Sequence, residues 1–242
     1  MLYMRSAQPP PPGQPDDRST PARIRDAAID LVADKGVAAL SARSVAERAG
    51  VSPALVIHHF GSMEALRTAC DEHVAQVVRE RKQEALDAGP GVDVLARLRD
   101  ARVGNATGYL AAVLAEDSAS VAALVDELVD DAQGYLESGV RSGMLQPSAN
   151  PRNRAVVLTL WGLGVLVLNQ HLKRLLGVDL TDPDADLPAT LGPYAIPVYE
   201  IYSHGMFSPE LAAATGRALA EMERLAKPPG TQETKPTSGE EK

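Results

Sequence analysis

The chain has 242 residues, which is long enough for one large domain or two small ones and for a substantial buried core. Its apolar content of 45% and charged content of 23% are those of an ordinary globular protein, and they exclude wholesale disorder, a collagen-like fibre and a disulfide scaffold. Aromatic residues make up only 4%, while Ala, Val, Leu and Arg abound, which favours helices over sheets. We therefore predict an all-α fold.

The net charge of −8 is unevenly distributed along the chain. Residues 18–63 carry six basic and four acidic side chains, a balance of +2, whereas residues 64–242 carry 17 basic and 26 acidic ones, a balance of −9. The positive balance of the first part permits binding to nucleic acid but does not demonstrate it.

Cysteine content and hydropathy predict a cytoplasmic protein. The single cysteine, Cys70, cannot form an intramolecular disulfide or a cysteine-rich zinc site, and it suits a reducing compartment. The longest apolar run, residues 155–168, is shorter than the roughly 20 residues that cross a bilayer, so it predicts a buried helix. An export signal has a charged segment, then an apolar segment and then a cleavage site of small residues, and the first residues of the chain do not show this order.

The ends of the chain differ from its body. Residues 1–17 are rich in proline, residues 228–242 have no apolar periodicity, and we predict both to be disordered tails. The body of the chain lies between these two tails. Within it, a Gly-Pro-Gly triplet at residues 89–91 predicts a domain boundary.

Helical spacing of apolar residues recurs throughout the body, and the helix ends are marked by capping residues, prolines and glycines. We expect the apolar run around Trp161 to lie in one long helix that begins after Asn150, and Pro197 to distort a later helix. Residues 177–192 predict an acidic, turn-rich connection. The predicted helices cover about residues 20–35, 41–49, 53–60, 63–88, 92–103, 105–116, 119–142, 151–176, 194–206 and 209–226.

Residues 41–60, SARSVAERAGVSPALVIHHF, carry the most specific pattern. Two short helices are joined by a tight turn at Gly50, and the second begins with the cap Ser52 and with Pro53, as a helix-turn-helix requires. An α-helix fits the major groove of DNA, and its first turn places N–H groups against phosphates and base edges. We expect His59 to pack inside this part, together with Val45, Ala49, Val51 and Val56.

Over residues 18–78 the sequence resembles the TetR family of bacterial transcription regulators. The resemblance implies a helix-turn-helix DNA-binding domain at 18–78, with the motif at 41–60, and a C-terminal helical domain for effector binding and dimerisation at 79–227. The second domain resembles the family only in its helix count and its two long late helices, so it identifies no ligand. The matching segments are 35–36 (KG), 45–52 (VAERAGVS), 58–62 (HHFGS) and 64–66 (EAL).

The resemblance also implies how DNA is bound. A homodimer would place its two third helices in successive major grooves of a palindromic operator, with the dimer formed through helices at about 152–176 and 194–226. Arg43 is the best candidate for a guanine or phosphate contact, because its guanidinium can bond bidentately. The DNA-binding residues that we infer are Ser41, Arg43, Ser44, Ser52, Pro53, Ala54, Leu55, Ile57, His58 and Met63.

Two of these positions depart from the family pattern. Ile57 stands where family members usually carry a tyrosine, and Met63 stands where they usually carry a lysine, both of which contact phosphate. We expect the electrostatic part of DNA binding to be weaker as a result, and less dependent on salt. A second class therefore stays open, a helical ligand sensor or partner-binding protein that has lost specific DNA binding.

Polar and aromatic side chains scattered through aliphatic helices suggest an effector site, and the aliphatic surroundings favour a small lipophilic molecule. The alternative is that these side chains fill a core and bond locally. The resemblance implies that the effector opposes DNA binding and relieves repression. The candidates are Asn105, Tyr109, Tyr135, Trp161 and Asn169.

No enzyme, cofactor or metal site is predicted. Cys70 and His73 lie three residues apart on a predicted helix, but no further cysteine is available to complete a metal site. Gly162 and Gly164 suggest a dinucleotide loop, yet the third glycine and the preceding strand are missing. The sequence also has no nucleophile elbow, Walker loop or zinc-protease motif.

Overall fold

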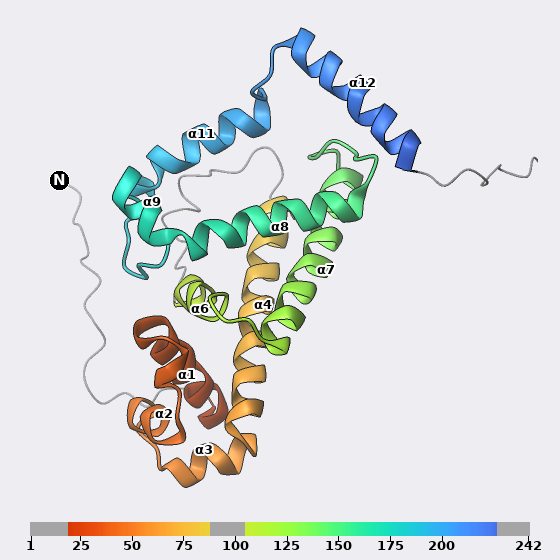
Figure 1. Ribbon diagram of the computed structural model, residues 1–242. Coiled ribbons are helices and arrows are strands. Elements are labelled where there is room, and N and C mark those ends of the chain that lie inside the picture. Colours follow the sequence, from red (N-terminus) through yellow and green to blue (C-terminus); the bar gives the residue numbers. More distant parts are fainter. Residues whose placement is uncertain (1–18, 88–104, 227–242) are drawn as a thin grey trace, which may run out of the picture. The chain divides into compact units, whose positions relative to one another are not determined.

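The computed structural model describes residues 19–87 and 105–226, and every regular element within these ranges is a helix (Figure 1). The all-α prediction is therefore confirmed. The predicted tails, the predicted helix at 92–103 and the Gly-Pro-Gly triplet at 89–91 lie outside the described residues.

The first part of the chain forms α1 (Thr20–Lys35), η1 (Val37–Ala39), α2 (Ala42–Ala49), α3 (Pro53–Phe60) and α4 (Met63–Asp87). Each of the four α-helices contributes at least one fully buried apolar side chain, which excludes water from their shared contact. The short 3-10 helix η1 was not predicted. One such side chain from each helix, in order, is Ile24, Val45, Val56 and Leu66.

The later helices agree with most of the predicted ranges. The bounds of α12 are those predicted, and α10 is a single turn within the connection that we predicted at 177–192. Pro197 lies inside α11. These helices are α6 (Ala106–Val113), α7 (Ala119–Arg141), α8 (Pro151–Val167), α9 (Asn169–Leu176), α10 (Leu187–Thr190), α11 (Gly192–Ser203) and α12 (Pro209–Ala226).

The prediction of one continuous helix over 151–176 is wrong, because the chain bends by 72° between α8 and α9. Asn169 follows the break, and its side-chain amide donates to Asp179 at 2.8 Å and to Thr181 at 3.0 Å. Its carbonyl oxygen accepts from the N–H of Leu180 at 2.9 Å. These bonds tie the following loop to the start of α9, and they accompany the bend.

No single described helix is long and apolar enough to cross a bilayer. Together α8 and α9 have the necessary length and composition, but the 72° bend separates them.

Described residues up to Pro193 form one unit, and those from Tyr194 onward form a second. Within the first unit, α1 packs against α6, α4 against α7, and α7 against α8. Its buried core continues from α1 through α7 to Leu166 on α8. In the second unit, no described side chain of α11 or α12 is buried. The domain boundary near residue 78 stays a prediction.

Candidate nucleic-acid interface

The turn between α2 and α3 depends on a glycine. Gly50 has φ 67° and ψ 37°, a left-handed backbone conformation that residues with a Cβ atom adopt only under strain. The N–H of Val51 then donates to the carbonyl of Ala46 at 2.9 Å, which closes the end of α2. From α1, the guanidinium of Arg23 donates to the carbonyl of Ala49 at 2.8 Å. This link was not predicted, because a contact with a main-chain carbonyl leaves no pattern in the sequence.

Two predicted DNA contacts, Ser41 and Ser44, form a capping box at the start of α2. The N–H of Ser44 donates to the Ser41 hydroxyl at 3.2 Å, and the N–H of Ser41 donates to the Ser44 hydroxyl at 3.1 Å. The Ser44 hydroxyl donates to the Ala39 carbonyl at 2.7 Å, and the two hydroxyls are 2.7 Å apart. Because both hydroxyl protons can be used within the protein, we expect Arg43 to be the main side-chain donor from this helix.

The exposed face of α3 holds most of the other predicted contacts. Residues three and four apart share a helix face, and the buried Val56 lies on the opposite side. Ser52 is exposed and accepts from the N–H of Leu55 at 3.2 Å, while the Leu55 side chain is half-buried. The exposed face consists of Pro53, Ala54, Ile57 and His58.

Two side chains, His59 and Val51, are placed differently from their prediction. His59 is exposed, so its predicted place in the interior is wrong; Val56 and Phe60, four residues apart, take the inward positions instead. Val51 is only half-buried. Met63, a predicted DNA contact, is half-buried against the core at the start of α4.

Several basic side chains near the motif have acidic neighbours. Arg48 forms an ion pair with Asp34, and Arg25 forms one with Asp26 at 2.8 Å. Arg43 is exposed, and its guanidinium has no partner among the described residues. Arg43 is therefore available to a phosphate or a base without breaking an existing bond.

Two hydrogen bonds, which we call the α6 junction, connect α6 with the DNA-binding helices. The Asn105 amide just before α6 donates to the Asp30 carboxylate of α1 at 2.5 Å. The Tyr109 hydroxyl on α6 donates to the Asp71 carboxylate of α4 at 2.6 Å. These two predicted effector residues therefore bond to other helices of the protein.

The Asp71–Tyr109 bond is buried, with side-chain exposures of 8% and 1%. Burial raises the pKa of Asp71, although the hydrogen bond from Tyr109 and the charge of Arg67 act in the opposite direction. Burial and the nearby Asp71 carboxylate raise the pKa of Tyr109, which stays protonated. Arg67 also pairs with Glu116 at 2.7 Å, so this buried acid lies within a charged network.

The other predicted effector residues do not gather with these two. Trp161 on α8 is 62% exposed, and Tyr135 on α7 is half-buried. Asn169 holds the loop after α9. For Asn105, Tyr109 and Asn169 the structure agrees with the alternative interpretation, in which they bond locally.

Two hydroxyl groups that the sequence analysis missed lie buried in α6 and α8. The Oγ1 atoms of Thr107 and Thr159 have no hydrogen-bond partner among the described residues. The two helices pack against each other. A threonine within an aliphatic helix was the only signal in the sequence, and it is too common to identify a site.

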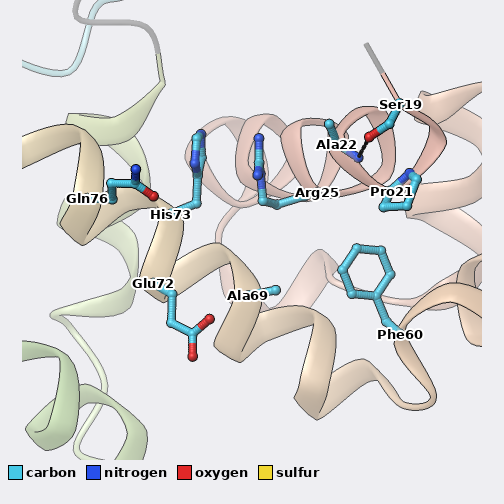
Figure 2. A pocket seen from close by; sticks show the side chains of 9 residues that line it. All are labelled: Ser19, Pro21, Ala22, Arg25, Phe60, Ala69, Glu72, His73 and Gln76. Atoms are coloured by element: carbon cyan, nitrogen blue, oxygen red, sulfur yellow. Dashed lines mark hydrogen bonds between the residues drawn. The ribbon is translucent and has the colours of Figure 1, made fainter.

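A pocket of about 300 Å³ lies between the start of α1 and α4 (Figure 2). Phe60 lies near its Ser19 end and Gln76 at the other, while Arg25 and His73 lie side by side between them. Burial and the charge of Arg25 lower the pKa of His73. This polar lining is unlike the aliphatic effector site that we predicted. No group of three metal-binding side chains occurs in the part of the chain that the structure describes.

Comparisons with known proteins agree with this architecture. Residues 24–70 match the family described as "Bacterial regulatory proteins, tetR family", and residues 102–208 match "Tetracyclin repressor-like, C-terminal domain". The chain is 36% identical over 199 residues to the HTH-type transcriptional regulatory protein RaaS of Mycobacterium tuberculosis, an alignment that covers 79% of this chain and 89% of the relative. Over 63 residues it is 38% identical to the HTH-type transcriptional regulator BetI of Rhizobium meliloti, covering 26% of this chain and 31% of that relative.

A solved structure shows a similar fold. The crystal structure of E. coli NemR in its reduced form matches with a TM-score of 0.50 and 21% identity, covering 63% of this chain and 88% of that one. At this identity the likeness concerns the fold alone. The two family matches and the long alignment with RaaS establish more: the chain belongs to the TetR family of DNA-binding transcription regulators, which is not a family of enzymes.

Proposed function

We propose that this regulator binds a palindromic operator as a homodimer in the cytoplasm, represses a neighbouring gene and is released by a small lipophilic effector. The observation that carries the proposal is the exposed face of α3, together with the exposed and unpartnered Arg43 guanidinium on α2, the helix that packs against α3. Helices of this size fit the major groove, and the rigid turn at Gly50 fixes the angle between them.

Exposed apolar side chains support dimerisation through the late helices. A large apolar surface on a single copy marks an interaction site, and a two-fold dimer uses the same surface on both copies. In α8, in α9 and at the residue between them, the exposed large apolar side chains are Val157, Leu160, Trp161, Val167, Leu168, Leu175 and Leu176. From α11 onward they are Ile196, Tyr199, Ile201, Tyr202, Met206, Phe207, Leu211, Leu219, Met222 and Leu225.

The packing of α6, α7 and α8 supports a lipophilic effector. Their buried positions are mostly aliphatic, including Leu110, Leu124 and Leu166. The unpartnered hydroxyls of Thr107 and Thr159 supply hydrogen-bonding groups within this surrounding, and they would fit an apolar molecule that carries a polar group.

The α6 junction supports a coupling between effector and DNA. An effector that displaces α6 changes α1 through Asn105 and α4 through Tyr109. The contact is close, because a Cβ on Gly108 would lie 3.0 Å from the Cβ of Ala33 on α1. Effector and operator then favour different settings of the same helices, and each weakens the binding of the other.

Fluorescence anisotropy with the DNA that flanks the gene for this protein tests the proposal. A shuffled fragment of equal length is the control. We expect saturable binding at least roughly 1000-fold tighter than to the control, as specific complexes show. Equal and weak binding to both fragments at moderate salt would contradict the proposal and favour a sensor that has lost specific DNA binding. Lipophilic compounds are then screened for release of the complex.

A further inference from the structure

Ile57 is unusual among the described residues of the DNA-binding part. It is 40% exposed, and no other large apolar side chain is exposed among those that the structure describes within residues 19–85. All the others in the described chain come from Val157 onward. The side chain lies on the exposed face of α3, near the middle of the helix and one turn beyond Pro53 and Ala54.

The composition of α3 limits how this helix can recognise bases. Its sequence, PALVIHHF, contains no Arg, Lys, Asn, Gln, Ser or Thr, so its only side chains that can hydrogen-bond are His58 and His59. Direct recognition in the major groove uses either hydrogen bonds to base edges or apolar contact with the methyl group of thymine. An exposed Ile at the centre of the helix suits the second kind of contact.

We propose that Ile57 and Ala54 contact thymine methyl groups, so that each operator half-site carries thymines beneath the middle of α3. This inference rests on the proposed binding to an operator. The two residues are three apart on the helix, where Cβ atoms are separated by about 5–6 Å. Base pairs along the duplex are about 3.4 Å apart, so the two side chains reach neighbouring or next-neighbouring pairs.

The exposure of Ile57 in the free protein is also compatible with a second kind of contact with DNA. Ile57 could pack against the sugars of the DNA backbone, where the identity of the base has no effect. Deoxyuridine distinguishes the two contacts, because it differs from thymidine only by the missing methyl group and keeps the same hydrogen-bonding edge.

The test uses the full-length protein and an operator selected from random-sequence DNA. Each thymine of that operator is replaced singly by deoxyuridine, and affinity is measured by anisotropy. We expect one or two positions in each half-site where the replacement weakens binding by about fourfold, the effect of exposing one buried methyl group. At the position beneath Ile57, the substitution Ile57→Ala should remove most of the sensitivity to deoxyuridine.

His59→Ala is the matched control, since this exposed neighbour lies outside the face of Ala54, Ile57 and His58; its sensitivity to deoxyuridine should match that of the unmodified protein. If no sequence is selected or bound, the proposed function itself fails. If an operator is bound but no thymine responds, or if the response persists in Ile57→Ala, the methyl contact is overturned while operator binding stands.

Discussion

The DNA-binding part of the chain and its late helices differ in how much of their apolar surface a single copy covers. Among the side chains that the structure describes within residues 19–85, Ile57 is the one large apolar side chain that is exposed. From Val157 onward, many such side chains are exposed, and Trp161 and Leu225 reach 62% and 73%. The apolar side chains of the first region are buried in a core that continues into α6, α7 and α8, whereas many of those in the late helices are exposed in a single copy.

This difference separates two roles that apolar side chains have in the protein. In the first region they hold α3 in place, and on the proposed function the few exposed groups of α3 select the DNA that is bound. In the late helices, on the proposed function, they supply the area for association between copies, and that association would set how far apart two α3 helices lie. Substitutions in the two regions should therefore fail in different ways.

The largest effect is expected for Trp161→Asp. An exposed Trp does not support the fold of one copy, but a buried charge at a two-fold interface is strongly unfavourable. We expect a monomer by analytical ultracentrifugation and a loss of operator affinity of at least about 100-fold, because two linked half-sites become one. Ala123→Asp, at an exposed position on α7, is the control. A Trp161→Asp protein that remains dimeric would place the interface elsewhere.

Tyr109→Phe tests the α6 junction. The change leaves the buried Asp71 carboxylate without its 2.6 Å hydrogen bond, and it should lower the free energy of unfolding by about 1–3 kcal/mol. Urea unfolding measures this loss, with Tyr199→Phe as the control at a tyrosine that is 63% exposed. An equal effect of both substitutions would show that the junction does not stabilise the fold.

Arg43→Ala should weaken operator binding by about tenfold or more, the effect of losing a bidentate contact with guanine. The stability of the free protein should not change, since the guanidinium has no partner among the described residues. Arg141→Ala, on α7, is the control for loss of one positive charge. Loss of affinity that is uniform across all operator variants would assign Arg43 to a phosphate instead of a base.

The raised pKa of Asp71 predicts how stability depends on pH. Because the folded protein holds this proton more tightly than the unfolded chain, the resulting stabilisation is fully present below the ordinary aspartate pKa of about 3.9. It is lost as the pH rises through the raised pKa of the folded state. Asp71→Asn keeps an acceptor for Tyr109, and unfolding at several pH values should show the variant gaining stability relative to the original protein as pH rises. A constant difference would contradict the raised pKa.

The smallest effect is expected for Met63→Lys, which restores the phosphate-binding residue usual in the family. One added phosphate contact in each protomer of the bound dimer should steepen the slope of log affinity against log salt by about 1.8. Met63→Gln is the uncharged control. An unchanged slope would mean that the start of α4, where Met63 is half-buried, does not approach the DNA backbone.

Local signals in the sequence predicted much of the fold. The cap at Ser52 and the glycine at the helix-turn-helix turn act within a few residues, and the structure has both where they were predicted. The bounds of α12 also agree with the apolar period.

Features that depend on distant partners could not be predicted. Asp71 and Tyr109 are 38 residues apart, and nothing near either residue indicates the bond. The bend before Asn169 accompanies hydrogen bonds between the Asn169 side chain and residues 179–181. No pattern in the sequence around residue 169 predicted this bend. The prediction for His59 was wrong because the helical period of α3 allowed more than one face to point inward. The packing of Val56 and Phe60 determines which face is buried.

The spacing of the operator half-sites tests most directly whether association through the late helices fixes the positions of the two α3 helices. Once the operator is known, five base pairs are inserted between its halves, which rotates one half by about half a turn of the duplex. We predict a loss of affinity of at least about 100-fold, because one dimer can then no longer contact both halves. Unchanged affinity would show that the copies bind independently, and it would contradict the proposed dimer.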